Sequence, residues 1–294
     1  TPTVYGTIAV LVVLLAVLGR ELVSGVRAYW LEHRALITRR WVVRRPSDAD
    51  RIPLIDVAFS GRDGTPLRGW YVPPRGQAVV ILCAGSEADR SAMLADARNL
   101  SGGGLGVLLF DWPGRGESGG AIQFGATERD ALEGALDFLL TRPGSEALRV
   151  GALGFSMGGY TVAQVASFDH RLGAVVLAGT PTDIVDQTRA EYARAGRAAQ
   201  YGALLAVARA GVRVHEMRPI DVANKIAPIP LVVVAGTDDV VVPASMSRQL
   251  YDAAHEPKEY WPIVGAGHGD YASHDPEYDA RVRAFFEAAL TVRP

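Results

Sequence analysis

The chain has 294 residues, of which 49% are hydrophobic, enough for one large domain with a single core or for two small domains. Its formal net charge of −2 provides no basic field that would attract nucleic acid. Cys83 is the single cysteine, which excludes an intrachain disulfide, and no group of cysteines and histidines has metal-ligand spacing. We therefore expect no nucleic-acid partner, no metal and no cofactor.

The N-terminal part begins with an uncharged apolar run, Val4–Gly19 (VYGTIAVLVVLLAVLG). Its length is at the short end of what spans a bilayer, roughly 17 to 20 residues. A signal peptide would have a basic residue before the run and a small-x-small cleavage site after it, and the sequence has neither. A buried core helix would have a polar face, which this run lacks. The run therefore predicts a single-pass membrane anchor.

Basic residues dominate the segment after this run. The segment has only two acidic residues, Glu21 and Glu32, but seven arginines: Arg20, Arg27, Arg34, Arg39, Arg40, Arg44 and Arg45. Positive charge is retained on the cytoplasmic side of a membrane, so we expect the rest of the protein to face the cytoplasm. Apolar residues recur at near-helical intervals at Leu22, Val26, Trp30 and Ile37. This spacing fits an amphipathic segment on anionic lipid, or an ordinary solvated helix that joins anchor and domain.

A polar, proline-bracketed stretch, Pro46–Pro53, predicts a linker. It divides the chain into an N-terminal anchor segment, residues 1–45, and a folded domain, residues 46–294. The domain opens with Ile55–Ser60 and Leu67–Val72, which flank the turn Arg62–Gly64 and predict a β-hairpin.

Short apolar runs alternate with longer amphipathic ones through the remainder of the domain. The predicted strands are Ala78–Cys83, Leu105–Phe110, Arg149–Leu153, Ala174–Ala178, Leu231–Ala235 and Glu259–Ile263. The predicted helices between and after them include Ala131–Leu140, Ala244–Ala254 and Asp279–Leu290. This alternation predicts an α/β fold with a mostly parallel sheet that is covered by helices on both faces.

One interval, residues 182–228, interrupts the alternation with almost 50 residues that contain no strand pattern. It has helical stretches at Asp183–Ala199 and Gln200–Ala210. An insertion of this length between two strands is typical of a lid over a binding site, and a long crossover helix without a binding role is the alternative.

Two stretches fit the pattern G-x-S-x-G, which marks a nucleophilic serine in many hydrolases: Gly116–Gly120 and Gly154–Gly158. The pattern needs a strand before it and a helix after it, because a sharp turn between them lifts the hydroxyl above the sheet. Ser118 follows a run of turn-forming residues, and no helix pattern starts after it. We predict that Ser118 is a loop residue.

Ser156 has the required context. The apolar stretch Leu148–Leu153 leads directly into its turn, and Gly159–Phe168 follows with a helical pattern. The positive N-terminal end of that helix would point at the site. We predict that Ser156 is the nucleophile.

A serine nucleophile needs a base to take its proton and an acid to orient that base. Of the six histidines, His268 lies on a glycine-rich stretch just past the last predicted strand, at the sheet edge where α/β enzymes collect their chemistry; His274 is the second choice. Asp238 and Asp239 both follow a predicted strand. Adjacent residues of an extended loop point in different directions, so only one of them can reach the imidazole.

Several motifs stand in one order along the chain. They are Gly69–Pro74, Asp111-x-x-Gly114-x-Gly116-x-Ser118, Gly154–Gly158, Gly236-x-x-Asp239 and Gly265-x-Gly267-His268. Over roughly residues 55 to 290 the chain resembles the α/β-hydrolase superfamily, closest to its membrane-anchored lysophospholipase-like and acylaminoacyl-peptidase-like branch. The resemblance implies the α/β-hydrolase fold with a small helical lid after an N-terminal transmembrane helix. It also implies that Asp239 is the acid, with His268 as base.

The resemblance further implies an oxyanion hole formed by the backbone N–H groups of Ser86 and Met157. Family members usually carry His-Gly after the third strand, whereas this chain has Ala84 before Gly85. Because the imidazole is not itself the donor, we expect function to persist with altered support of this loop.

Together these features predict a membrane-anchored serine hydrolase that cleaves an ester, thioester or amide through an acyl-enzyme, with a carboxylesterase-like or lipase-like activity favoured. Its partners would be a small-molecule or lipid-like acyl substrate and, through the anchor, membrane lipid. An acyltransferase or peptidase could use the same three residues. A non-catalytic binding protein of the same fold at the membrane is the alternative from another class.

Overall fold

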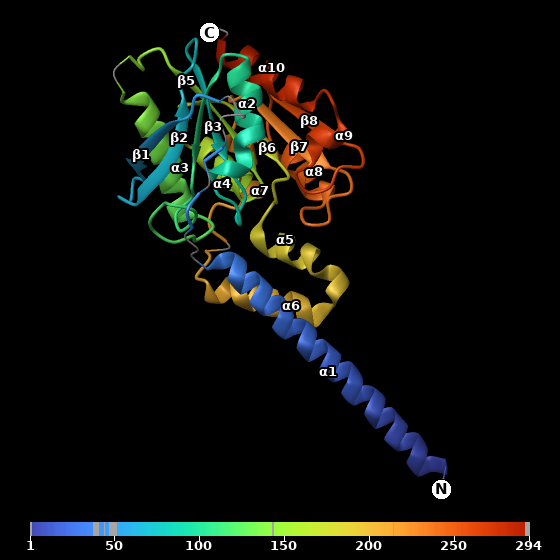
Figure 1. The fold of residues 1–294 in the computed structure, drawn as a ribbon. Helices are drawn as coiled ribbons and strands as arrows, with labels where there is room; N and C mark the ends of the chain where they lie inside the picture. The colour runs from blue at the N-terminus through green and yellow to red at the C-terminus, as the bar shows by residue number, and fades with distance from the viewer. Residues whose placement is uncertain are drawn as a thin grey trace.

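The computed structural model describes residues 2–37, 41–43, 45–46, 52–142, 144–213 and 215–291. An α/β body carries one long N-terminal helix that projects away from it (Figure 1). The helices are α1 (Pro2–Leu36), α2 (Leu94–Gly102), α3 (Ala126–Leu140), α4 (Met157–Ala166), α5 (Ile184–Glu191), α6 (Arg197–Arg209), α7 (Pro219–Val222), α8 (Ala244–Ala253), α9 (Tyr271–His274) and α10 (Tyr278–Thr291). Short 3₁₀ turns occur at Arg90–Met93, Ala193–Ala195 and Ala223–Lys225.

A single sheet forms the centre of the body. Its strands are β1 (Ile55–Ser60), β2 (Pro66–Val72), β3 (Ala78–Cys83), β4 (Gly106–Phe110), β5 (Arg149–Phe155), β6 (Leu172–Ala178), β7 (Leu231–Gly236) and β8 (Lys258–Ile263). Within the described residues the sheet has eight strands in the order β1-β2-β4-β3-β5-β6-β7-β8. The β1–β2 and β2–β4 pairs are antiparallel and all other pairs are parallel. The predicted opening hairpin and the predicted parallel sheet are both confirmed.

The central strands are buried on both faces. In β3, Val79, Ile81 and Cys83 belong to the core formed with α3 and α4, whereas Val80 and Leu82 belong to the core formed with α2 and α10. Figure 1 shows these helices on both sides of the sheet. Because each face needs apolar side chains, the strand reads as a continuous apolar run instead of an alternating one.

The N-terminal apolar run lies within α1, a single helix of 35 residues. Side chains such as Leu11, Leu15 and Leu18 are more than half exposed, so the body provides no core for them. Thr7–Leu36 is long and apolar enough to cross a membrane. Arg39, Arg40 and Arg44 of the predicted basic flank, and most of the predicted linker Pro46–Pro53, lie outside the described residues.

The C-terminal half of α1 packs lengthwise against α6 (Figure 1). Ala28 on α1 is buried together with Ala199 and Ala203 on α6. A Cβ atom on Gly202 would lie only 2.0 Å from the carbonyl oxygen of Gly25, so this contact requires glycine. The predicted anchor segment is therefore not separate from the insertion between β6 and β7. Small residues bring the two helix backbones close together.

The insertion differs in detail from the sequence prediction. The stretch Asp183–Ala199, predicted as one helical stretch, is divided, because α5 ends at Glu191 and α6 starts at Arg197. Gly196 between them has φ +93°, a left-handed conformation that glycine adopts without the steric cost of a side chain. The break turns the chain back so that α6 can run along α1.

Candidate active site

Ser156 occupies a sharp turn between β5 and α4, with φ 53°. This left-handed conformation is rare for residues with a side chain and is typical of a strained functional position. The two glycines of the motif permit the turn. A Cβ atom would lie 2.5 Å from the backbone of Gly158 if placed on Gly154, and 2.0 Å from the Cys83 carbonyl oxygen if placed on Gly158. The strand–turn–helix context predicted for Ser156 is present.

His268 follows β8, and its imidazole is oriented by Asp239, which follows β7. A hydrogen bond of 2.7 Å joins Nδ1 of His268 to Oδ2 of Asp239. The other carboxylate oxygen, Oδ1, accepts the backbone N–H groups of Val241 (2.9 Å) and Val242 (2.8 Å). The carboxylate is therefore buried, fully hydrogen-bonded and directed at the ring.

The two alternatives considered from the sequence lie elsewhere. Asp238 is exposed, and its carboxylate accepts a hydrogen bond from Thr237. His274 is exposed, and its Nδ1 lies 3.1 Å from the carbonyl oxygen of Asp270. Neither side chain contributes to the His268 pair.

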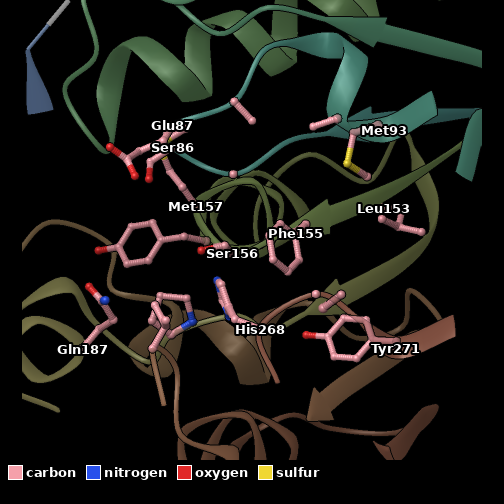
Figure 2. A pocket seen from close by; sticks show the side chains of 18 of the residues that line it. Ser86, Glu87, Met93, Leu153, Phe155, Ser156, Met157, Gln187, His268 and Tyr271 are labelled. Carbon is pink, nitrogen blue, oxygen red and sulfur yellow. The ribbon is translucent and has the colours of Figure 1, made fainter. Parts of the chain in front are cut away.

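Ser156 and His268 line the same pocket, and Figure 2 shows their side chains next to each other. The Phe155 ring packs on the imidazole with ring centroids 4.7 Å apart. Within the described residues no hydrogen bond joins Oγ of Ser156 to His268. Such a bond is often long in a substrate-free site and tightens when substrate binds. The structure therefore brings the three sequence-predicted residues to one end of the sheet.

Ser86 and Met157, the two residues predicted to supply backbone N–H groups, line the same pocket as this serine. Met157 is the first residue of α4, where an N–H group has no partner within the helix, and Ser86 follows Gly85 after β3. In the part of the chain that the structure describes, neither N–H has a hydrogen-bond acceptor. A Cβ atom on Gly85 would lie 3.6 Å from the Ser156 Cβ, so the loop approaches the serine closely.

Ala84, which stands where family members usually carry histidine, is buried, and its carbonyl oxygen accepts the indole N–H of Trp112 at 2.8 Å. Cys83, just before it, is fully buried, and burial raises the pKa of its thiol well above the ordinary value. The thiol therefore stays protonated at neutral pH, as expected for a small core residue.

Ser118, in the other G-x-S-x-G stretch, is completely buried in the loop after β4. Its Oγ donates to the Asp111 carbonyl oxygen at 2.7 Å and accepts the Arg68 N–H at 3.0 Å. The Asp111 carboxylate in turn accepts the N–H groups of Arg90 (2.8 Å) and Glu117 (2.9 Å). Ser118 thus holds the loop together and does not face the pocket.

The pocket has a volume of about 640 Å³. Apolar groups form much of its wall, including Met93, Phe124, Leu153, Phe155 and Ile184. Five acidic residues among those described also line it, namely Glu32, Glu87, Asp96, Glu191 and Asp279. Glu32 comes from α1 and accepts a hydrogen bond of 3.3 Å from the Tyr192 hydroxyl.

Sequence reasoning missed the contribution of α1 to this pocket, made through Glu32 and Ala35. It also missed Arg115, a buried side chain that touches the Ser86 loop. In the sequence, Glu32 and Arg115 differ from their neighbours only by their charge: Glu32 is an acidic residue in a largely apolar helix, and Arg115 is a basic residue between two loop glycines. Charge alone does not identify a partner that lies far away in the chain.

The chain is similar to several known proteins. Residues 74–218 match the family model described as Serine aminopeptidase, S33. The protein Rv2307c of Mycobacterium tuberculosis is 30% identical over 256 residues, which is 84% of each chain. The polyketide transferase grgF of a Penicillium species is 25% identical over 277 residues, covering 78% of this chain and 94% of that protein.

Among solved structures, the esterase Pf2001 of Pyrococcus furiosus superposes with a TM-score of 0.74 at 21% identity, over 86% of this chain and 97% of the esterase. At this identity the similarity to the esterase concerns the fold alone, and evidence of common ancestry comes from the sequence relatives. The family match and the sequence relatives, together with the superposable esterase fold, place this chain in the α/β-hydrolase superfamily, to which it belongs.

Proposed function

We propose that this protein is a serine hydrolase in which Ser156 attacks a carbonyl carbon, His268 takes the serine proton and Asp239 orients the imidazole. The observation that carries the proposal is the 2.7 Å bond between His268 and a buried, hydrogen-bonded Asp239, next to a serine on a strained turn. A buried carboxylate stabilises the imidazolium that forms when the serine proton is transferred.

Each step of the reaction has a residue to perform it. As Oγ of Ser156 bonds to the carbonyl carbon, the carbonyl oxygen gains the negative charge, which the N–H groups of Ser86 and Met157 stabilise. His268 then gives its proton to the leaving group as the carbon–leaving-group bond breaks. A water molecule, deprotonated by His268, attacks the acyl-enzyme and releases the acid and the free serine.

A carboxylic ester is the favoured substrate, because apolar groups form much of the pocket wall and suit an acyl chain. The family model, described as an aminopeptidase, favours peptide amides as the second substrate class. The similarity to a polyketide transferase favours transfer of the acyl group to an acceptor other than water. All three reactions share the same acyl-enzyme.

The insertion between β6 and β7 acts as a lid. Ile184 and Gln187 of α5 line the pocket, and α6 holds the insertion against α1. The apolar α1 spans a membrane as a single pass, with the hydrolase domain on the cytoplasmic side. In support, Leu22, Val26 and Trp30 at the lid level are exposed, as lipid-facing residues would be. Resistance to extraction at alkaline pH, and labelling of the domain only after the membrane is opened, test this arrangement.

The decisive experiment is labelling with a fluorophosphonate probe, which reacts with an activated serine. The wild-type protein and Ser118→Ala should be labelled, and Ser156→Ala should not. Rates with p-nitrophenyl esters of increasing chain length, compared with aminoacyl p-nitroanilides, then assign the substrate class. Labelling that persists in Ser156→Ala, or a wild type that neither reacts with the probe nor turns over any ester or amide, would refute the proposal and favour a binding protein.

A further inference from the structure

The loop that follows β4 carries a second buried element beside Ser118, the side chain of Arg115, which is 1% exposed. Its Nε donates a hydrogen bond to the carbonyl oxygen of Ser86. Its two terminal nitrogens donate at the C-terminal end of α1, one to the carbonyl oxygen of Ala35 in the last turn and the other, at 2.8 Å, to that of Ile37 just after the helix. One guanidinium therefore joins the proposed oxyanion loop directly to the C-terminal end of the N-terminal helix.

The chemistry of each group suits this contact. The last carbonyl groups of a helix have no partners within the helix and carry partial negative charge, so a cation is stabilised there. The guanidinium is planar and presents several N–H groups in a fixed fork, so it can hold two separate acceptors at a defined angle. Lysine, with a single flexible ammonium group, could not reproduce that geometry.

Trp41 ties the chain just beyond α1 to the same region. Its backbone N–H donates to the Gly116 carbonyl oxygen at 3.0 Å, next to Arg115. Its indole N–H donates to the Asp89 carboxylate at 2.6 Å, and Asp89 also accepts the Ser91 N–H at 2.7 Å. Asp89 lies three residues after Ser86. Trp41, just beyond α1, therefore contacts both the loop that carries Arg115 and the loop that follows Ser86.

Building on the hydrolase function proposed above, we propose that Arg115 is a positioning residue for the oxyanion hole, with the end of α1 as its support. The Ser86 carbonyl belongs to the peptide plane directly after the Ser86 N–H. Holding that plane restricts rotation of the neighbouring N–H, which must point at the developing oxyanion. Since Glu32 and Ala35 of the same helix turns line the pocket, α1 is a working part of the active site as well as an anchor.

The test is Arg115→Lys in the full-length protein. We expect kcat to fall about 10- to 100-fold with little change in KM, because a misplaced donor removes part of the roughly 100- to 1000-fold effect of one oxyanion donor. The inhibition constant of a trifluoromethyl ketone, whose adduct places an oxyanion in the same hole, should rise by the same factor. The matched control is Arg171→Lys, since Arg171 pairs with Asp137 and Asp169 and does not line the pocket. Arg171→Lys should leave kcat, KM and the inhibition constant of the ketone unchanged.

Trp41→Phe keeps the experiment decisive if Arg115→Lys fails to fold. It removes the indole bond to Asp89 while keeping an aromatic ring and the backbone bond to Gly116, and we expect a smaller shift of kcat and of the ketone constant in the same ratio. Unchanged kcat, or a change confined to KM, in the variant that folds would overturn the positioning role. Failure of the hydrolase proposal is recognised separately, because the wild type would then show neither turnover nor fluorophosphonate labelling.

Discussion

Oδ2 of Asp239 lies 2.7 Å from Nδ1 of His268, while the adjacent Asp238 points into solvent. The two carboxylates therefore form a matched pair for mutation. We expect Asp239→Asn to lower kcat by about 10⁴-fold, because an amide favours the wrong imidazole tautomer and cannot stabilise the imidazolium. Asp238→Asn should stay within about twofold of the wild type. Steady-state ester hydrolysis measures both, and similar losses in the two variants would contradict the assignment.

The two G-x-S-x-G serines should separate activity from stability. Ser118→Ala removes the buried bond to the Asp111 carbonyl and leaves the part-buried Arg68 N–H without its acceptor, which together cost about 1 to 3 kcal/mol. A loss of that size lowers the melting temperature by roughly 2 to 12 °C in a domain of this size. Ser156→Ala should melt close to the wild type while losing its activity. Thermal unfolding by circular dichroism, combined with the activity assay, distinguishes the two serines.

The close approach of α1 and α6 makes a prediction about glycine. In Gly202→Ala the new methyl group would lie 2.0 Å from the Gly25 carbonyl oxygen, so the helices must separate. We expect faster proteolysis in the turn between α5 and α6 and a lower melting temperature in detergent. Gly19→Ala is the control, because nothing lies within 4 Å of its Cβ position. Alanine there should be neutral or stabilising, by up to about 1 kcal/mol. Equal protease resistance of the two variants would count against tight packing.

We expect Asp96, on α2 at the pocket wall, to make stability depend on pH. Burial, with a further contribution from the nearby charge of Asp279, raises the pKa of Asp96 from 3.8 to about 7. A raised pKa means that the native state keeps a proton that the unfolded chain releases, so this group costs stability as the pH rises from about 4 to 7.

We therefore expect Asp96→Asn to match the wild type near pH 4 and to be more stable above pH 7, with a plateau beyond. Denaturant unfolding across this range measures the difference. Asp279→Asn should shift the same transition to lower pH, because it removes the neighbouring negative charge. A constant difference between Asp96→Asn and the wild type at all pH values would show that Asp96 does not titrate in this window.

Much of the fold could be predicted from the sequence because the patterns that specify a strand or a turn span only a few consecutive residues. The run Ala78–Cys83 reads as a strand buried on both faces, and it is one. The turn at Ser156 could be predicted from two glycines between an apolar strand and a helix, since the steric demand arises within five residues. For the acid, the residue pattern reduced the choice to Asp238 or Asp239, and the family resemblance favoured the second.

By itself, then, the sequence determined the strands, the apolar helix, the serine turn and the residue types available for the chemistry, because these depend on neighbours a few residues apart. Only the tertiary structure decided that α1 packs on α6, that Glu32 reaches the pocket and that Arg115 joins Ser86 to Ala35. These contacts join segments about 30 to more than 150 positions apart in the chain. They depend on the shape and hydrogen-bonding groups of both partners at once, which no local pattern records.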